Sequence, residues 1–140
     1  TSFTNNGNMP SEYTCDGDDL SPPLSISDVP SNAKSLALVM DDPDAPAGTW
    51  DHWVVFNIPA ATKEIPKGTE PKGTKGKNSW GRTGYGGPCP PSGTHRYFFK
   101  LYALDTALNL PEGAAKKELE RAMQGHVVAQ AELMGTYKRR

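Results

Sequence analysis

The chain has 140 residues and a formal net charge of −1, so it has the size of one domain and lacks the basic excess of nucleic-acid-binding proteins. Its 14 glycines and 13 prolines favour turns between strands and argue against a helical bundle or coiled coil. No apolar run approaches the roughly 20 residues of a membrane-spanning helix, so we treat residues 1–140 as a single domain without a transmembrane segment.

The first half of the chain predicts two buried strands between loops. Residues 1–34 are rich in turn-forming residues and predict loop with short strand. The apolar runs SLALVM (35–40) and WVVFNI (53–58) predict buried strands. Residues 63–88 hold many lysines and glycines and predict a long polar loop, a type of segment that often carries function.

The second half predicts two strands around one helix. The aromatic-rich residues 97–104 (YFFKLYAL) and the alternating residues 127–137 predict strands. Pro111 at a first helical turn predicts a helix through EGAAKKELERAMQ, ended by Gly125. One face of this helix would carry Ala115, Leu119, Ala122 and Met123. We therefore expect a mainly β fold, an antiparallel sheet or sandwich with one or two peripheral helices.

The first polar motif is DDPDAP (41–46), at the exit of a predicted strand. Three carboxylates within four residues repel one another unless they are solvated or meet a cation, a donor or a shared proton. The two prolines hold the backbone around them, and Ala45–Pro46 is a candidate for a cis bond. The alternative is an acidic turn that only caps the strand.

Two further motifs place histidines next to unusual neighbours. Trp50-Asp51-His52-Trp53 lets an acid orient an imidazole that a tryptophan shields, although a histidine packed at a strand edge would look the same. In residues 86–97, His95 and Tyr97 are two apart and project from one face of a strand that follows a Gly/Pro-rich loop. This arrangement indicates an oxyanion site, and its alternative is an ordinary turn before a strand.

In combination, DDPDAP, DHW and GPCPPSGTHRYFFKLYALD resemble the phosphatidylethanolamine-binding protein (PEBP) family, most closely its bacterial and archaeal, Raf-kinase-inhibitor-like branch. YTCDGDDLSPPL and AQAELMGTYKR also fit that branch, so the resemblance covers nearly the whole chain. It implies a PEBP-like antiparallel β-sandwich and a pocket that binds phosphate or a phospholipid headgroup. The ligand-binding residues that it implies are Asp42, Asp44, Pro46, Trp50, His52, Gly87, Pro90, His95 and Tyr97.

The resemblance also brings the two cysteines close to this pocket. It implies either a Cys15–Cys89 disulfide, in an oxidising compartment, or two free thiols. Two cysteines are too few for a metal site, so no metal and no cofactor are expected. Because a carboxylate beside an imidazole raises its pKa, we expect the pocket histidines to charge readily and anion binding to strengthen below pH ~7.

The leading functional hypothesis is a regulatory module that binds a small anion without turnover. One alternative is a protease or kinase inhibitor that acts through the 63–88 loop. A second is a hydrolase that uses the His/Asp/Tyr pocket, against which stand the absence of a G-x-S-x-G motif and of three-ligand metal spacing. We expect a monomer or a homodimer, without preference. The expected compartment is the cytoplasm, with the periplasm or secretion as the alternative if a signal peptide has been removed.

Overall fold

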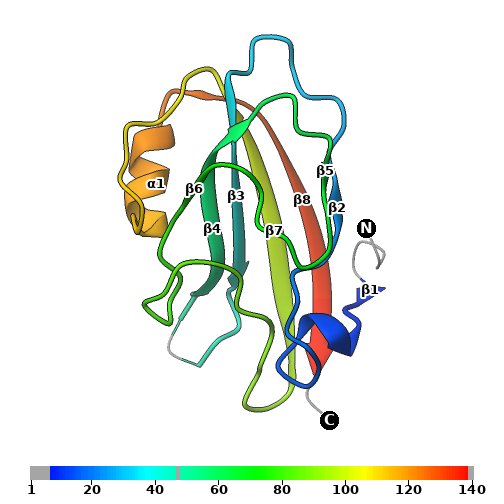
Figure 1. The fold of residues 1–140 in the computed structure, drawn as a ribbon. Helices are drawn as coiled ribbons and strands as arrows, with labels where there is room; N and C mark the ends of the chain where they lie inside the picture. Colours follow the sequence, from blue (N-terminus) through cyan, green and yellow to red (C-terminus); the bar gives the residue numbers. More distant parts are fainter. Residues whose placement is uncertain (1–6, 47, 139–140) are drawn as a thin grey trace.

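The computed structural model describes residues 7–46 and 48–138, and its main feature is a sheet of six strands (Figure 1). Neighbouring strands are antiparallel, except that β1 runs parallel to β8. The mainly β architecture expected from the sequence is therefore confirmed. In spatial order the strands are β1 (Gly7–Asn8), β8 (Val127–Lys138), β7 (Thr94–Leu104), β3 (Ser35–Asp42), β4 (Trp50–Pro59) and β6 (Thr74–Lys75).

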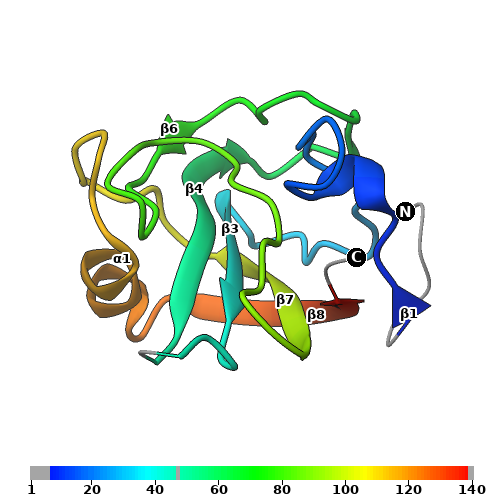
Figure 2. The same cartoon turned by 90° about the horizontal axis from the view of Figure 1, so that it is seen from below.

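Each face of the main sheet is covered by a different layer, as the end-on view in Figure 2 shows. On one face lie the helical turn η1 (Ser11–Tyr13) and a small sheet, in which β2 (Leu24–Ser25) pairs with β5 (Glu64–Ile65). On the other face lies α1 (Lys116–Met123). We call these the small-sheet face and the helix face.

The central strand β3 is buried along its whole length because both of its faces are covered. Side chains alternate between the faces of a strand. Leu36, Leu38 and Met40 therefore join the core of the small-sheet face, whereas Ala37 and Val39 join that of the helix face. Buried on both sides, such a strand appears in the sequence as a continuous apolar run.

The helix α1 is shorter than the sequence predicts. Pro111 belongs to a preceding turn, in which the Ala114 N–H donates to the Pro111 carbonyl, so its placement in the first helical turn was wrong. Leu119 and Met123 are buried as expected, and Gly125 follows the helix at a φ of +80°, which favours glycine.

The sequence prediction of a polar loop over residues 63–88 was only partly right. This segment contains β5 and β6, which attach it to both sheets. Strand β4 begins at Trp50, three residues earlier than predicted, and β7 begins at Thr94 rather than at Tyr97. Across the described residues, no helix is long and apolar enough to cross a membrane.

A β-bulge in β4 orients one of the candidate site residues. Met40 pairs with Trp53, but the next residue of β3, Asp41, pairs with Asp51, so His52 is an extra residue opposite β3. Such an extra residue re-aims side chains locally. His52 consequently lies against Tyr97, on the small-sheet face, instead of facing α1.

Candidate functional site

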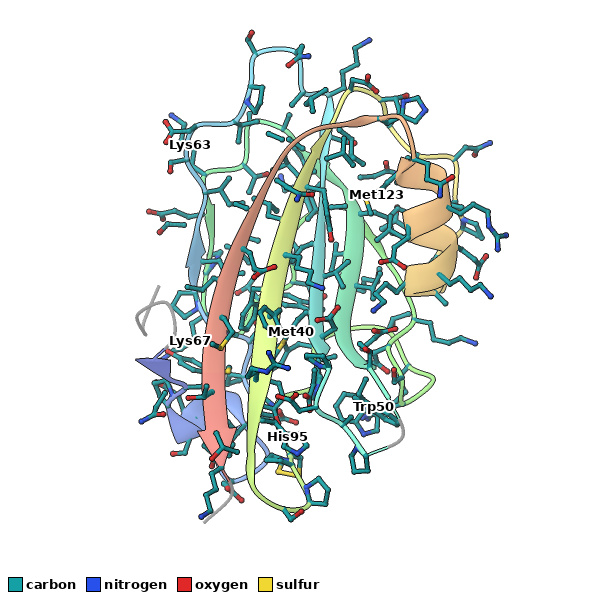
Figure 3. All side chains as sticks on the ribbon, turned by 180° about the vertical axis from the view of Figure 1, so that it is seen from behind. Met40, Trp50, Lys63, Lys67, His95 and Met123 are labelled. Carbon is teal, nitrogen blue, oxygen red and sulfur yellow. A yellow bond between two sulfur atoms is a disulfide. The ribbon has the colours of Figure 1, made fainter. Side chains whose placement is uncertain are left out.

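A cavity of about 300 Å³ opens at the end of the main sheet where β3 ends and β7 begins. Figure 3 shows two of its residues, Trp50 and His95, at this end, while Met123 of the helix lies farther along the sheet. We call it the sheet-end cavity. It is lined by Asp42, Ala45, Pro46, Trp50, His52, Trp80, Cys89, Pro90, Pro91, His95 and Tyr97.

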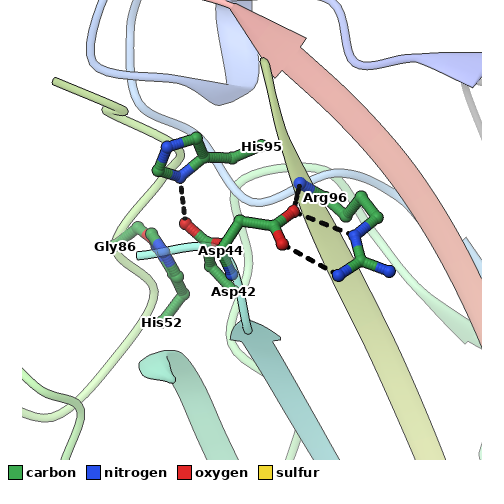
Figure 4. Close-up of polar contacts among 6 residues, drawn as sticks. All are labelled: Asp42, Asp44, His52, Gly86, His95 and Arg96. Carbon is green, nitrogen blue, oxygen red and sulfur yellow. Dashed lines mark hydrogen bonds and ion pairs between the residues drawn. The ribbon is translucent and has the colours of Figure 1, made fainter. Parts of the chain in front are cut away.

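A buried imidazole–carboxylate pair forms the polar floor of the cavity. The Nδ1 atom of His95 lies 2.7 Å from Oδ2 of Asp42, and both side chains are almost fully buried (Figure 4). The other oxygen of Asp42 accepts a hydrogen bond from the Asp44 backbone N–H at 2.8 Å. Both carboxylate oxygens are thus engaged, and the Nε2 atom of His95 is the ring nitrogen left for a ligand.

The second histidine is clamped by the backbone of the 86–91 loop. The Nδ1–H of His52 donates to the Gly86 carbonyl at 2.7 Å, because a carbonyl can only accept, and the Gly86 N–H donates back to the His52 carbonyl at 3.0 Å. In the neutral ring, Nε2 of His52 is then an acceptor. Burial lowers the pKa of His52 and outweighs the opposing influence of Gly86 and Asp42. Neighbouring acids do raise the pKa of His52, but burial outweighs them, so the expectation that this histidine charges readily was wrong.

Between the two imidazoles lies Tyr97, whose hydroxyl has no partner among the described residues. The Tyr97 ring contacts His52 edge-on at 5.3 Å between centroids and stacks on His95 at 6.4 Å. Its hydroxyl is buried, and no residue in the part of the chain that the structure describes pairs with it. Burial, reinforced by the charges of Asp42 and Asp44, raises the pKa of Tyr97, so the hydroxyl keeps its proton. Buried donors are normally hydrogen-bonded, and the described residues supply no acceptor for this one.

Two of the residues expected in the site lie outside the cavity lining. Asp44 binds Arg96 in a fork, with Nε at 2.9 Å and Nη2 at 2.8 Å, and this pairing lowers the pKa of Asp44 to about 2. Gly87 packs against the N-terminal segment, where its N–H donates to Asp19 at 2.8 Å and a Cβ would collide with the same carboxylate. Asp44 and Gly87 therefore contact residues behind the cavity walls and not the cavity itself.

Known proteins resemble this chain over nearly its whole length. The family model described as phosphatidylethanolamine-binding protein matches residues 1–138. The chain belongs to the phosphatidylethanolamine-binding protein family. A UPF0098 protein of Methanothermobacter thermautotrophicus is 54% identical over 98% of this chain and 95% of its own length. One from Aquifex aeolicus is 53% identical, over 99% of this chain and 85% of its own.

Solved structures agree with the family assignment and its fold. A putative PEBP homologue of Chlamydia trachomatis superimposes with a TM-score of 0.97 at 44% identity, covering 100% of this chain and 95% of the other. Escherichia coli YbcL, described as a new member of the mammalian PEBP family, superimposes with a TM-score of 0.91 at 30% identity, covering 100% and 96%. The PEBP-like fold expected from the sequence motifs is therefore confirmed.

In this PEBP family member, sequence reasoning missed one large wall of the cavity. Trp80, from the segment expected to be a polar loop, contacts Trp50 and His52 edge-on, at 5.5 and 5.0 Å between ring centroids. Gly86 lies beneath this ring and has no room for a Cβ. The available signal was that Trp80 and Tyr85 are the two aromatic residues in an otherwise polar stretch. Ala45, Cys89 and Pro91 also line the cavity.

The covalent features of the rim are also defined in the structure. Cys15 and Cys89 form a disulfide with a Cα–Cα distance of 5.4 Å, and the Cys15 N–H donates to the Pro88 carbonyl. The Ala45–Pro46 bond is trans, so its candidacy for a cis bond was wrong. The Gly48 N–H donates to the Ala45 carbonyl and closes a turn in which Pro46 is the second residue. A proline at this position of a common turn is compatible with a trans bond.

Proposed function

We propose that this PEBP family member binds a small phosphate-bearing anion in the sheet-end cavity and holds it without turnover. The observation that carries the proposal is the buried, unpaired Tyr97 hydroxyl beside the His95–Asp42 pair. A bound oxyanion supplies the acceptor that this hydroxyl lacks. The ligand class covers both free phosphate and a phosphorylated headgroup, because the recognised group is the same.

The donors and acceptors of the cavity match a phosphate group. The carboxylate of Asp42 holds Nδ1 of His95, which leaves Nε2 of this ring for the ligand, and Tyr97 donates from its hydroxyl. Neutral His52 accepts at Nε2, so it suits the P–OH of a partly protonated phosphate. Pro46 and Pro90 add apolar walls, and hydrogen bonds are stronger in such a low-dielectric site.

Size and chemistry favour binding over turnover. A volume of about 300 Å³ lies at the lower end of the range for small-ligand pockets, which suits a phosphate with a short organic group. Among the described residues, the lining contains no serine or threonine, and the thiol of Cys89 is consumed in the disulfide, so a serine-, threonine- or cysteine-type nucleophile is absent from it. The alternatives, a hydrolase and an inhibitor acting through residues 63–88, stay predictions.

The test is a calorimetric and NMR titration with inorganic phosphate and, separately, phosphoethanolamine. Tyr97→Phe removes only the hydroxyl and should weaken binding about tenfold, the value of one buried hydrogen bond. His95→Gln should weaken it by roughly 10- to 100-fold, since the ring nitrogen that faces the ligand and the pairing with Asp42 are both lost. The control is His126→Gln, because His126 pairs with Asp105 at the far end of the paired strands β7 and β8. This variant should bind phosphate like the wild type.

Three outcomes would contradict the proposal. The first is a folded wild-type protein that binds neither compound at millimolar concentration. The second is equal loss of affinity in the His126 control, which would locate binding elsewhere. The third is release of inorganic phosphate from phosphoethanolamine in a ³¹P NMR time course, which would favour the hydrolase.

A further inference from the structure

Directly behind the sheet-end cavity, on the helix face of the main sheet, four charged side chains meet. Asp41 is buried, with 2% of its surface exposed, and its Oδ2 atom lies 3.1 Å from Nζ of Lys100 and 3.3 Å from Nζ of Lys116. The same ammonium group of Lys116 lies 2.9 Å from Oδ1 of Asp51. Lys116 is the first residue of α1, so the helix reaches the sheet through this ion cluster.

The two carboxylates of the cluster face each other across a strand pair. Asp41 of β3 is the register partner of Asp51 of β4, directly after the bulge at His52. Like charges directly opposite one another on neighbouring strands are destabilising. Lys116 contacts both carboxylates and offsets this repulsion, whereas Lys100 contacts Asp41.

Each anchored residue is followed in the chain by a residue of the cavity. Asp42 follows Asp41, and His52 follows Asp51. Because successive side chains of a strand point to opposite faces, holding one residue from the helix face orients the next on the small-sheet face.

The ion cluster is also linked to the Trp80 wall. The Asp51 N–H donates to Oγ of Ser79 at 2.7 Å, and the Ser79 N–H donates to the Asp51 carbonyl at 2.8 Å. Trp80 is the next residue, and its own N–H donates to Oδ1 of Asn78. The position of Asp51 thus sets the position of this aromatic wall.

We infer that Lys116 is a positioning residue of the sheet-end cavity: from the reverse face of the sheet it holds the ends of β3 and β4 together and so sets the geometry of Asp42, His52 and Trp80. This inference rests on the proposed phosphate-binding function of the cavity. Nothing in the motifs around DDPDAP or His95 points to this lysine, which lies on a helix more than 60 residues further along the chain than Asp51.

The charge of Lys116 has a second consequence for the same site. Burial disfavours its ammonium form, but Asp51 and Asp41 more than compensate and raise the pKa of Lys116, so the group stays charged at neutral pH. Removing this charge leaves one uncompensated negative charge behind His52. The titratable groups around that imidazole are Asp42 on β3, Asp51 on β4, Asp19 on the N-terminal segment, and His95 and Tyr97 on β7. The added negative potential would raise the pKa of His52 and repel a bound anion.

The experiment uses the whole chain and three variants. Lys116→Met removes the charge and keeps an unbranched stem, and Lys116→Arg restores the charge. Lys117→Met is the matched control, because Lys117 is the exposed next residue of the same helix. The readouts are phosphate affinity by calorimetry, the imidazole titrations of His52 and His95 by NMR in ligand-free protein, and stability in urea.

For Lys116→Met we expect phosphate binding to weaken about tenfold, the size typical of coupling within one ion-pair network. The His52 titration should move to higher pH. Lys116→Arg should restore both values, and Lys117→Met should change neither. If Lys116→Met does not fold, Lys116→Gln replaces it, since the amide retains a donor without the charge.

The inference would be overturned if the folded charge-removal variant bound phosphate as tightly as the wild type and its His52 titrated at the same pH. A fall in the stability of this variant would not change that conclusion. If the wild-type protein binds no phosphate, the proposed function fails by itself. A His52 titration that still moves in Lys116→Met and returns in Lys116→Arg would then support the positioning role independently of the ligand.

Discussion

Reducing the Cys15–Cys89 disulfide should lower the free energy of unfolding by about 4 kcal/mol. The bond joins residues 74 positions apart, and closing a loop of that length removes this much chain entropy from the unfolded state. For a domain of this size the same change corresponds to a fall in Tm of roughly 15 °C. The measurement is urea denaturation followed by tryptophan fluorescence, with and without a phosphine reductant.

The matched control is the double variant Cys15→Ser/Cys89→Ser, which should show the lower stability at once and should not respond to the reductant. A difference below about 1 kcal/mol between the oxidised and reduced wild type would refute the loop-entropy reasoning.

Phosphate affinity should change little in folded reduced protein, although Cys89 lines the cavity. Non-covalent bonds join the same two segments, since Tyr85 donates to the Tyr13 carbonyl at 2.7 Å and Gly87 donates to Asp19 at 2.8 Å. Loss of binding by folded reduced protein would show that these bonds do not hold the rim.

Three further predictions concern packing and pH. Leu119→Ala deletes a fully buried side chain between α1 and the sheet and should cost about 3 kcal/mol in urea denaturation, whereas a cost below about 1 kcal/mol would mean that the site repacks. Because the pKa of His52 lies below its ordinary value of 6.5 in the folded state, the unfolded chain binds this proton more readily, and stability should fall as pH drops below about 6.5. That slope should flatten in His52→Gln, and an unchanged stability–pH curve would contradict the burial of a neutral imidazole. Asp44, with its pKa lowered from 3.8 to about 2, contributes stability above pH 3.8 that is lost as pH falls toward 2. Since the pair with Arg96 is exposed, Asp44→Asn should remove less than about 1 kcal/mol at pH 7, and a larger loss in thermal denaturation would indicate a role beyond this pair.

Strand positions could be predicted because they depend on short-range patterns. The run from Ser35 to Met40 is apolar on both faces, and β8 from Val127 alternates, so each pattern predicts a strand without knowledge of its neighbours. The same holds for the pairing of His95 and Tyr97 on one strand face, which follows from their spacing of two. Strand ends were less predictable, because β4 begins at Trp50 through pairing with the polar end of β3.

The amino-acid sequence alone determined the mainly β class and the motifs that resemble the PEBP family. It also pointed to His52, His95 and Tyr97 as candidate site residues. Only the tertiary structure decided which of these groups meet. Asp42 reaches His95 across 53 residues because β3 and β7 pair in one register, and His52 turns to the cavity because β4 bulges there. Lys116 contacts Asp51 from the opposite face of the sheet because α1 packs there. Local propensity acts over a few residues, whereas register, bulges and helix docking result from packing the whole chain, so the site's geometry is a property of the fold.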